Sequence, residues 1–215
     1  MRSRFRRATV ALSVTLSLVV CVTACDPLDG AAPASEPAGP SPAPTTSPAG
    51  SPESNDAYAP PRFAPQVRKH AKAAAVSPVL LMAILYNESY KPHDPDLERA
   101  WQKIDPNAAF GVANMHEAAF DDTRQGRPFA DRSWTELPDD PDLAIEAAAW
   151  YLHDLGAGLT GGTGGHNRND LLATGYNAGP GHMAAVAAGT APNAGAREYV
   201  ATLHENWSRA RQALR

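Results

Sequence analysis

An uninterrupted apolar run, Val-Leu-Leu-Met-Ala-Ile-Leu-Tyr, occupies residues 79–86. Ser77-Pro78 precedes it, and a serine N-cap followed by proline at the first helical position is a common helix start. Because the run is apolar on nearly every face, it predicts a helix that lies in the centre of a core. This helix is expected to end at Asn87-Glu88-Ser89.

Helical patterns also fill most of the chain after residue 62. Residues 66–76 are rich in Ala, Lys and Arg, which favour helices. Asp140-Pro141 starts a further helix, and Gly156-Ala157-Gly158 ends the apolar pattern that follows. Other helices are expected at 168–176, at 182–188 and from Ala196 towards the C-terminus. Strand patterns are scarce, so the sequence predicts an all-α domain over residues 62–215.

Residues 25–61 have a different composition. The segment after Cys25 is rich in Pro, Ala, Ser, Gly and Thr and has no apolar periodicity. Such a sequence cannot bury enough apolar surface to offset the entropy of ordering it, and its prolines favour an extended, semi-stiff chain. We therefore expect residues 25–61 to form a disordered tether in front of the helical domain.

Residues 1–24 have the features of an export signal. Four arginines within the first seven residues precede an uncharged apolar run from Ala8 to Val20. The sequence Val-Thr-Ala-Cys at 22–25 resembles a bacterial lipobox, which implies cleavage before Cys25 and a diacylglyceryl group on it. The mature protein is then expected on the outer face of the cell membrane, facing the cell wall. An uncleaved anchor is the alternative, since the uncharged run 8–24 is just short of the roughly 18–20 residues that span a bilayer.

Cysteine and charge content exclude several classes of function. Both cysteines, Cys21 and Cys25, belong to the leader and its cleavage site, so the domain has no disulfide and no cysteine-ligated metal. The histidines lack the spacing of a metal-binding helix, and no metal or cofactor is expected. Without its four leader arginines the chain has 15 basic against 23 acidic residues, which does not indicate nucleic-acid binding. We expect a monomer whose membrane association depends on the lipid at Cys25.

Glu88 is the most informative polar residue of the domain. It ends the predicted apolar helix, and a carboxylate held against apolar neighbours has its charged form disfavoured. The pKa of Glu88 is therefore expected to rise, which suits a general acid near neutral pH. The alternative is a solvated glutamate at a helix end, and position alone favours that alternative.

Four motifs follow one another in the order found in a known enzyme family. They are Glu88-Ser89, Ala-Phe-Gly-Val-Ala-Asn-Met at 109–115, Leu-Ala-Thr-Gly-Tyr-Asn-Ala-Gly-Pro-Gly at 172–181 and Arg-Glu-Tyr-Val at 197–200. In this order they resemble the soluble lytic transglycosylases of the lysozyme-like superfamily, over roughly residues 66–207. The block at 176–181 is the most specific part, whereas Tyr199-Val200 is weak. The resemblance implies a lysozyme-like helical fold and cleavage of the glycan strands of peptidoglycan.

The resemblance also assigns roles to individual residues. Glu88 matches the family's sole catalytic acid/base, and Ser89 matches a neighbour that orients the carboxyl group or the sugar. Tyr176 matches a tyrosine that faces the catalytic carboxyl group across the cleft. Gly111 and Asn114 occupy the ends of a turn that borders the cleft. The substrate-contacting residues that the resemblance implies are Ser89, Gly111, Asn114, Met115, His116, Tyr176, Asn177 and Tyr199.

The chain departs from the family pattern mainly in this turn. Residues 112–114 are Val-Ala-Asn in place of Leu-Met-Gln, and His116 stands where a sugar-contacting methionine is usual. Gly195 occupies the position of a helper glutamate in many relatives. Since the glutamate and the tyrosine of the site remain, these changes suggest an altered substrate preference rather than a loss of activity.

The reaction that the resemblance implies needs one carboxyl group. Lytic transglycosylases use the acetamido group and the 6-hydroxyl of muramic acid, so Glu88 alone serves as acid and then as base. A hydrolase needs a second carboxyl group about 5–9.5 Å away. Asp94, Asp96 and Asp105 are candidates for it, although their contexts favour turns or caps. A murein-binding scaffold without activity is a further possibility. Among the tryptophans, Trp134 has the best chance of stacking on a sugar.

Overall fold

A computed structural model describes residues 57–90, 93–105 and 107–215 of the chain. These residues are predominantly helical, and their only extended pairing is an isolated antiparallel bridge between Phe110 and Met115. The prediction of an all-α domain is confirmed. In chain order the elements are the 3-10 helix η1 (Pro60–Phe63), the helices α2 (Ala64–Ala73), α3 (Pro78–Glu88), α4 (Pro95–Gln102) and α5 (Glu117–Thr123), the 3-10 helix η2 (Trp134–Glu136), and the helices α6 (Pro141–Gly158), α7 (Arg168–Ala178), α8 (Pro180–Ala187) and α9 (Ala194–Ala213).

The predicted leader 1–24, the lipidation site Cys25 and nearly all of the tether 25–61 lie outside the described residues. Near the start of the described part, the Tyr58 ring packs edge-on against His93 with 4.4 Å between the ring centres. Within the described ranges, no helix combines the length and the apolar character that crossing a bilayer requires.

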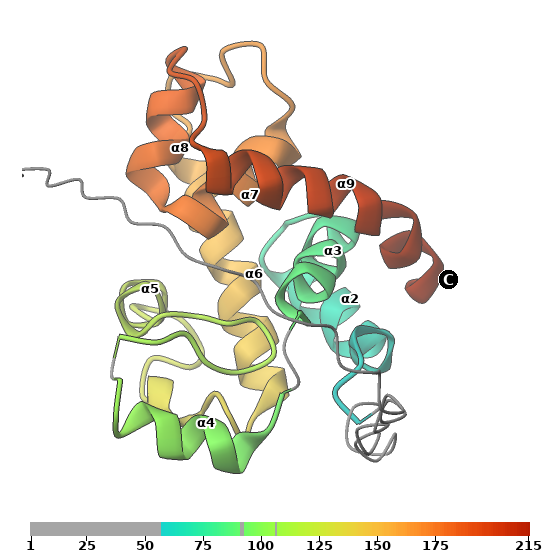
Figure 1. The fold of residues 1–215 in the computed structure, drawn as a ribbon, viewed down its shortest axis with the longest axis vertical. Coiled ribbons are helices and arrows are strands. Elements are labelled where there is room, and N and C mark those ends of the chain that lie inside the picture. Colours follow the sequence, from blue (N-terminus) through green and yellow to red (C-terminus); the bar gives the residue numbers. More distant parts are fainter. Residues whose placement is uncertain (1–56, 91–92, 106) are drawn as a thin grey trace, which may run out of the picture. The chain divides into compact units, whose positions relative to one another are not determined.

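Helix α3 lies at the centre of the domain and packs against α2 and α9 (Figure 1). The side chains of residues 80–85 are at most 1% exposed, so the predicted central helix is confirmed. Its start has the predicted cap, because Ser77 Oγ accepts a hydrogen bond from Leu80 N at 3.3 Å. Burying each large apolar side chain stabilises the fold by about 1.5–3 kcal/mol. Packing of apolar side chains on every face of α3 therefore fixes its position in the domain.

Helix α6 is the second buried helix, and it contacts α2, α5, α7 and α8. Figure 1 shows it running from the part of the domain that holds α4 and α5 to the part that holds α7 and α8. Ala144, Ala147 and Ala148 on this helix are fully buried, and such small side chains let neighbouring helices approach closely. The helix begins after Asp140 and ends at Gly158, as the sequence predicts.

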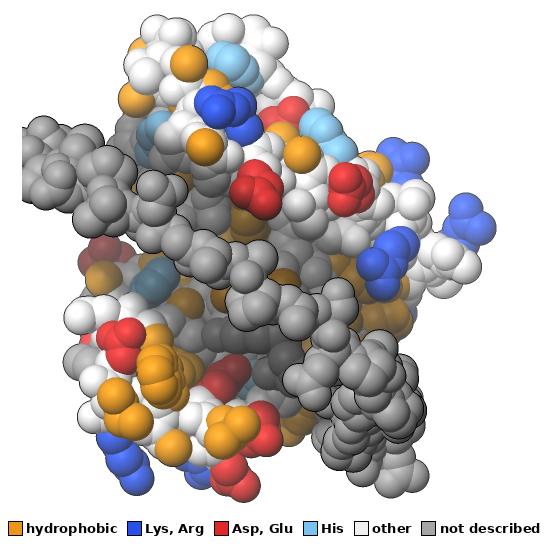
Figure 2. Space-filling view, viewed as in Figure 1, with side chains coloured by type: hydrophobic (Ala, Val, Ile, Leu, Met, Phe, Trp, Pro, Cys, Tyr) orange, Lys and Arg blue, Asp and Glu red, His pale blue; other side chains and the backbone are white. Residues whose placement is uncertain are grey.

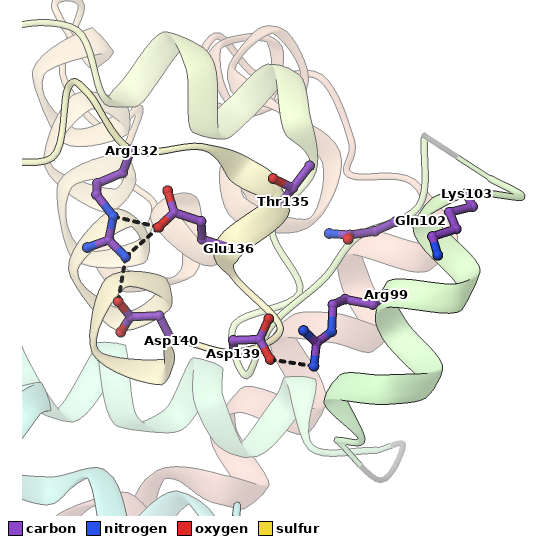
Figure 3. A pocket seen from close by; sticks show the side chains of 8 residues that line it. All are labelled: Arg99, Gln102, Lys103, Arg132, Thr135, Glu136, Asp139 and Asp140. Atoms are coloured by element: carbon purple, nitrogen blue, oxygen red, sulfur yellow. Dashed lines mark hydrogen bonds and ion pairs between the residues drawn. The ribbon is translucent and has the colours of Figure 1, made fainter.

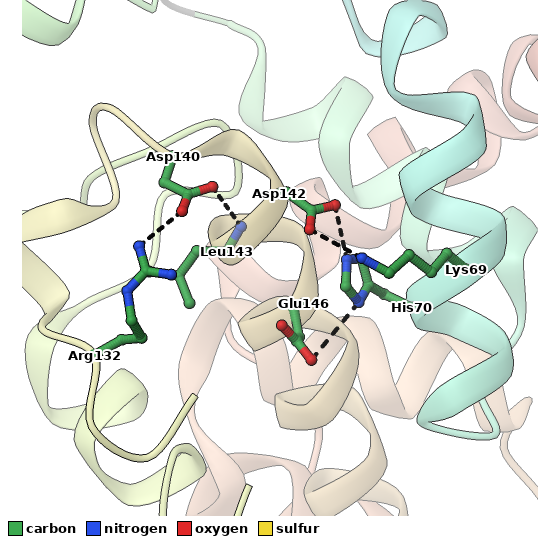
Figure 4. A network of polar contacts seen from close by, with 7 residues as sticks. All are labelled: Lys69, His70, Arg132, Asp140, Asp142, Leu143 and Glu146. Atoms are coloured by element: carbon green, nitrogen blue, oxygen red, sulfur yellow. Dashed lines mark hydrogen bonds and ion pairs between the residues drawn. The ribbon is translucent and has the colours of Figure 1, made fainter. Parts of the chain in front are cut away.

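A polar network ties the first turn of α6 to α2 (Figure 4). Asp142 pairs with Lys69 Nζ at 3.1 Å and with His70 Nε2 at 2.9 Å, and His70 is 2% exposed. His70 Nδ1 also lies 3.9 Å from Glu146. Partial burial raises the pKa of Asp142, but the hydrogen bonds from His70 and Lys69 outweigh burial and hold that pKa below its usual value. The charged form of Asp142 is thus the one that joins the two helices.

Several details of the helical pattern differ from the sequence prediction. The helix expected at 66–76 ends at Ala73, because Ala75 adopts a left-handed φ of 54°. The short helices η1, α4, α5 and η2 have no counterpart in the prediction. The last three lie between residues 93 and 140, where short elements alternate with turns and no long apolar period develops.

Asp140→Ala is expected to lower the free energy of unfolding by about 1–2 kcal/mol, the usual effect of losing a helix cap. The Asp140 carboxylate accepts a hydrogen bond from Leu143 N at 3.0 Å and pairs with Arg132 at 2.8 Å. Asp140→Asn keeps an oxygen acceptor for the Leu143 amide and should retain most of the stability. Urea unfolding followed by circular dichroism measures both variants. Equal losses would show that the pair with Arg132, and not the cap, supplies the stabilisation.

Candidate active site

Glu88 is the last residue of α3, and its carboxyl group lies between two segments that are distant in the sequence. Tyr199 on α9 donates a hydrogen bond from its hydroxyl to Glu88 Oε1 at 2.6 Å. Asn114 Nδ2 donates to Glu88 Oε2 at 3.1 Å and to the Glu88 backbone oxygen at 3.1 Å. The residue as a whole is of intermediate exposure. Donors from two sides therefore hold its carboxyl group in one orientation.

Two buried amides hold α9 against the end of α3. Asn87 Nδ2 donates to the Tyr199 backbone oxygen at 3.0 Å, and Asn206 Nδ2 donates to Asn87 Oδ1 at 3.0 Å. Both asparagines are 8% exposed, and leaving such a buried amide unpaired costs about 1–3 kcal/mol. This pairing fixes the register between the helices and so places Tyr199 over Glu88. The sequence interpretation missed it, although a buried-face asparagine next to Glu88 in an apolar helix is a usable signal.

The turn at residues 110–115 brings Asn114 to the end of α3. Phe110 and Met115 exchange backbone hydrogen bonds of 3.2 and 3.0 Å, and Asn114 N donates to Gly111 O at 3.0 Å. Gly111 has a φ of 75° and Asn114 a φ of 44°. Glycine and asparagine adopt this left-handed region more readily than other residues. The two residues of this turn that have a positive φ are thus the two ends of the predicted turn.

Gly111 also needs the absence of a side chain. A Cβ at this position would lie 2.8 Å from Leu137 O, so any other residue would push the turn away from the segment that follows η2. The Gly111 amide donates to Glu98 Oε2 at 2.7 Å. Gly111 therefore supports the site through its backbone, whereas the resemblance assigns it a contact with substrate.

Tyr176 lies close to the site but does not bond the carboxyl group. Its hydroxyl donates to Ala113 O at 2.7 Å, so Tyr199 is the tyrosine that contacts Glu88. Burial raises the pKa of both tyrosines well above the usual value, and the negative charge of Glu88 adds to each shift. Both hydroxyls therefore stay protonated and act as donors into the alkaline range.

Three other predicted contact residues lie at the surface around the turn and the helix ends. Ser89 is exposed, and its Oγ donates to Tyr86 O at 2.8 Å rather than to the Glu88 carboxyl group. His116 is exposed at the start of α5, with Nδ1 donating to Asn107 O at 2.7 Å. Asn177 is exposed near the end of α7. The structure does not bring these three onto the carboxyl group, although each is accessible to a ligand.

Two predicted sugar contacts need correction. Met115 is 2% exposed, so its side chain belongs to the core and is not available to a ligand. Trp134 is 4% exposed, and its Nε1 donates to Met115 O at 2.8 Å. The expected sugar-stacking role of Trp134 is therefore wrong, because its ring packs on Phe110 beneath the turn. Its neighbours Ser133 and Thr135 are exposed, so the local sequence is polar although the Trp134 ring itself is buried.

The three aspartates considered as a second acid all serve their own segments. Asp94 caps α4 by accepting hydrogen bonds from two backbone amides at 3.0 and 3.1 Å. Asp105 accepts one from the amide two residues later at 3.0 Å. Asp96 pairs with Arg99 at 3.1 Å, and its side chain is 94% exposed. These contacts confirm the cap and turn contexts that the sequence indicates.

A cavity of about 670 Å³ lies between α4 and the segment before α6 (Figure 3). The charged groups that line it are largely paired with one another. Arg99 pairs with Asp139 at 2.9 Å, and Arg132 pairs with Glu136 and Asp140 at 2.8 Å each. Its lining includes none of the groups that hold Glu88. In the part of the chain that the structure describes, no cluster of three or more His, Cys, Asp or Glu side chains is arranged to hold a metal ion.

The surface carries both signs of charge on the face shown in Figure 2, where acidic and basic side chains are interspersed. Large exposed apolar side chains gather on α4 and the residues next to it, where Leu97, Trp101 and Ile104 are 69%, 51% and 70% exposed. Trp101, and not Trp134, is therefore an accessible tryptophan of this domain.

A family model described as Transglycosylase SLT domain matches residues 65–198, which is more than half of the chain. The match covers Glu88, the turn at 110–115 and Tyr176, and it ends one residue before Tyr199. A search of curated proteins finds no match.

Two partly buried tyrosines, Tyr176 and Tyr199, predict a loss of stability at alkaline pH. A group whose pKa is raised by folding stabilises the fold fully below its unfolded-state pKa, about 10 for tyrosine, and this contribution is lost as the pH rises towards the folded-state pKa. In that window each such tyrosine should lower the free energy of unfolding by about 1.4 kcal/mol per pH unit. Tyr176→Phe and Tyr199→Phe should each flatten the slope accordingly, as measured by urea unfolding at several alkaline pH values.

Tyr90→Phe is the control for this experiment. Tyr90 is 76% exposed, so its replacement should leave the slope as in the wild type. An unchanged slope in Tyr176→Phe and Tyr199→Phe would contradict the raised pKa values of these two side chains.

Proposed function

The chain belongs to the transglycosylase SLT domain family, and from this premise we propose that it is a lytic transglycosylase of peptidoglycan. Its target is the β-1,4 bond between N-acetylmuramic acid and N-acetylglucosamine in the glycan strand. The observation that supports this proposal is the Glu88 carboxyl group, which Tyr199 and Asn114 hold from two sides at the end of a buried helix. The same arrangement supports Glu88 as the acid/base.

Glu88 acts first as an acid and then as a base. In the first step its carboxyl proton goes to the glycosidic oxygen, the bond from that oxygen to C1 of muramic acid breaks, and the acetamido group of the same sugar stabilises the positive charge at C1. In the second step the Glu88 carboxylate takes the proton of the 6-hydroxyl as its oxygen bonds to C1. The products are a free 4-hydroxyl on glucosamine and a 1,6-anhydromuramic end. Glu88 is protonated again, and no water is consumed.

The two donors on Glu88 suit this cycle. Hydrogen bonds to a carboxylate favour its charged form, so Tyr199 and Asn114 stabilise the species between the two steps. They also fix its direction, which matters because proton transfer requires close, aligned atoms. The 6-hydroxyl belongs to the sugar being cleaved, so ring closure is intramolecular and needs no second carboxyl group. Ser89, His116 and Asn177 remain the accessible candidates for sugar contacts.

We also propose that a lipid on Cys25 holds the domain on the outer face of the cell membrane, facing the cell wall. The leader 1–24 supports this placement through its basic start, its apolar run and the Val-Thr-Ala-Cys sequence. The mature composition has no polybasic segment that could bind the membrane in place of the lipid. A membrane-held enzyme at this location would act on the nearest glycan strands.

Glu88→Gln is expected to lower the rate of peptidoglycan cleavage by at least about 100-fold, because the amide cannot transfer a proton. The variant keeps the size of the side chain and should fold with the thermal midpoint of the wild type. Release of soluble fragments from purified peptidoglycan measures the rate. Glu117→Gln, which changes an exposed acid at the start of α5, is the control and should keep the wild-type rate. Cleavage retained in Glu88→Gln would end the assignment of Glu88.

Mass spectrometry of the released fragments separates the proposed reaction from its alternatives. Anhydromuramic ends indicate transglycosylation, whereas reducing ends indicate a lysozyme-type hydrolase with a second acid. Binding to insoluble murein without release of fragments indicates a scaffold without activity. The proposal requires anhydromuramic ends.

Growth of the native host with an alkyne fatty acid is expected to label the wild-type chain. Cys25→Ala should abolish the label, because the replacement removes the thiol that carries the diacylglyceryl group. Gel fluorescence after coupling to a dye measures both. A wild-type chain that stays unlabelled would contradict the lipid anchor and leave the uncleaved apolar leader as the membrane attachment.

A further inference from the structure

Glu98 and His93 form a buried pair beneath the turn at residues 110–115, and the mechanism above does not use it. The Glu98 and His93 side chains are 9% and 7% exposed. His93 Nδ1 lies 2.8 Å from Glu98 Oε1, and His93 Nε2 lies 3.0 Å from Pro138 O. Glu98 Oε2 accepts the Gly111 amide at 2.7 Å. A carboxyl group is rarely buried to this extent unless its partners are fixed.

The hydrogen bonds determine how many protons this pair holds. A carbonyl oxygen only accepts, so the contact with Pro138 requires a proton on His93 Nε2. A second proton lies between His93 Nδ1 and Glu98 Oε1. The pair is therefore an imidazolium with a carboxylate, or a neutral imidazole with a carboxylic acid. In both forms every polar atom of the pair has a partner, which holds Glu98 in one position.

Glu98 is connected to the Glu88 carboxyl group through the turn. The Gly111 backbone is held by Glu98 on its amide and accepts a hydrogen bond from Asn114 N at 3.0 Å on its carbonyl oxygen. Asn114 Nδ2 then donates to Glu88 Oε2 at 3.1 Å. Leu137 O would lie only 2.8 Å from a Cβ on Gly111, so the turn has little room to shift on that side. The position of Asn114 thus depends on the contact between Glu98 and Gly111.

We propose that Glu98, itself held by His93, is a positioning residue for the reaction. It fixes the turn so that Asn114 holds the Glu88 carboxyl group in the orientation needed for proton transfer. This inference rests on the proposed function of Glu88. A displacement of about 1 Å at a reacting group can lower a rate about 100-fold. Sugar binding uses other groups as well, so loss of Glu98 should lower kcat much more than it raises KM.

A double-mutant cycle between Glu98 and Asn114, made in the full chain with peptidoglycan fragments as substrate, tests this inference. Glu98→Ala and Asn114→Ala are each expected to lower kcat about 10- to 100-fold and to change KM less than about threefold. The double variant should be no slower than the slower single variant, because both changes remove the same support. Losses that multiply would show that Glu98 acts independently of Asn114, which overturns the proposal.

The conservative variant Glu98→Gln should restore activity. The glutamine oxygen can accept the Gly111 amide, and its NH₂ group can donate to Nδ1 of a neutral His93 whose Nε2 still faces Pro138 O. Its kcat is expected within about threefold of the wild type. Glu98→Asp keeps the charge but is one methylene shorter and cannot reach both partners, so it should resemble Glu98→Ala. Glu98→Asp replaces Glu98→Ala in the cycle if the alanine variant does not fold. A glutamine variant slower than the aspartate variant overturns the proposal.

Arg99→Ala is the matched control on α4. Arg99 pairs with Asp139 at 2.9 Å on the cavity side of the helix, so its loss tests whether any weakening of α4 lowers kcat. Arg99→Ala should leave kcat unchanged. An equal loss of kcat in Arg99→Ala and Glu98→Ala would show that Glu98 only stabilises α4, which overturns the positioning role.

Deuterium exchange of the Gly111 amide, followed by NMR, is a readout that does not require activity. Exchange should be faster in Glu98→Ala and unchanged in Arg99→Ala, because only Glu98 accepts this amide. A wild-type chain that leaves peptidoglycan intact overturns the proposed function. Unchanged Gly111 exchange in Glu98→Ala overturns the positioning role by itself, so the two failures are distinguishable.

Discussion

Glu88 is the last residue of a helix whose residues 80–85 are almost completely buried. The hydrogen-bond donors to its carboxyl group come from other segments of the chain. Tyr199 supplies one at 2.6 Å and Asn114 another at 3.1 Å. Neither donor can reach the carboxyl group unless α9 packs on α3 and the turn at 110–115 packs against the segment after η2. The packing that stabilises the core therefore also sets the geometry of the Glu88 carboxyl group.

The two supports of the site are of different physical kinds. On the α9 side, Asn87 and Asn206 form a neutral amide pairing that is buried between the helices. On the turn side, Glu98 and His93 form a pair that carries titratable groups. The position of Tyr199 is thus set by hydrogen bonds between neutral amides, whereas that of Asn114 depends on a buried carboxyl group and its imidazole partner.

The sequence predicts the elements of this fold better than it predicts the contacts between them. The cap at Ser77, the buried helix after it and the terminal position of Glu88 follow from local patterns, and the structure confirms them. Local patterns do not predict which tyrosine, Tyr176 or Tyr199, bonds the Glu88 carboxyl group. Motif order gives no distances, and the answer depends on how α9 packs on α3. The sequence does not single out Glu98 either, since one charged residue in a short polar stretch gives no sign that its side chain is buried.

The departure from the family pattern at Asn114 has a structural explanation in the same terms. Asn114 adopts a φ of 44°, a conformation that asparagine tolerates better than glutamine does. Its side chain is one methylene shorter, so its amide reaches Glu88 only if the turn lies close to the end of α3, where it also binds the Glu88 backbone oxygen at 3.1 Å. A short contact tolerates less displacement than a long, flexible one. A turn with asparagine at this position therefore has to be held more rigidly. The hydrogen bond from the Gly111 amide to the buried Glu98 carboxyl group holds it.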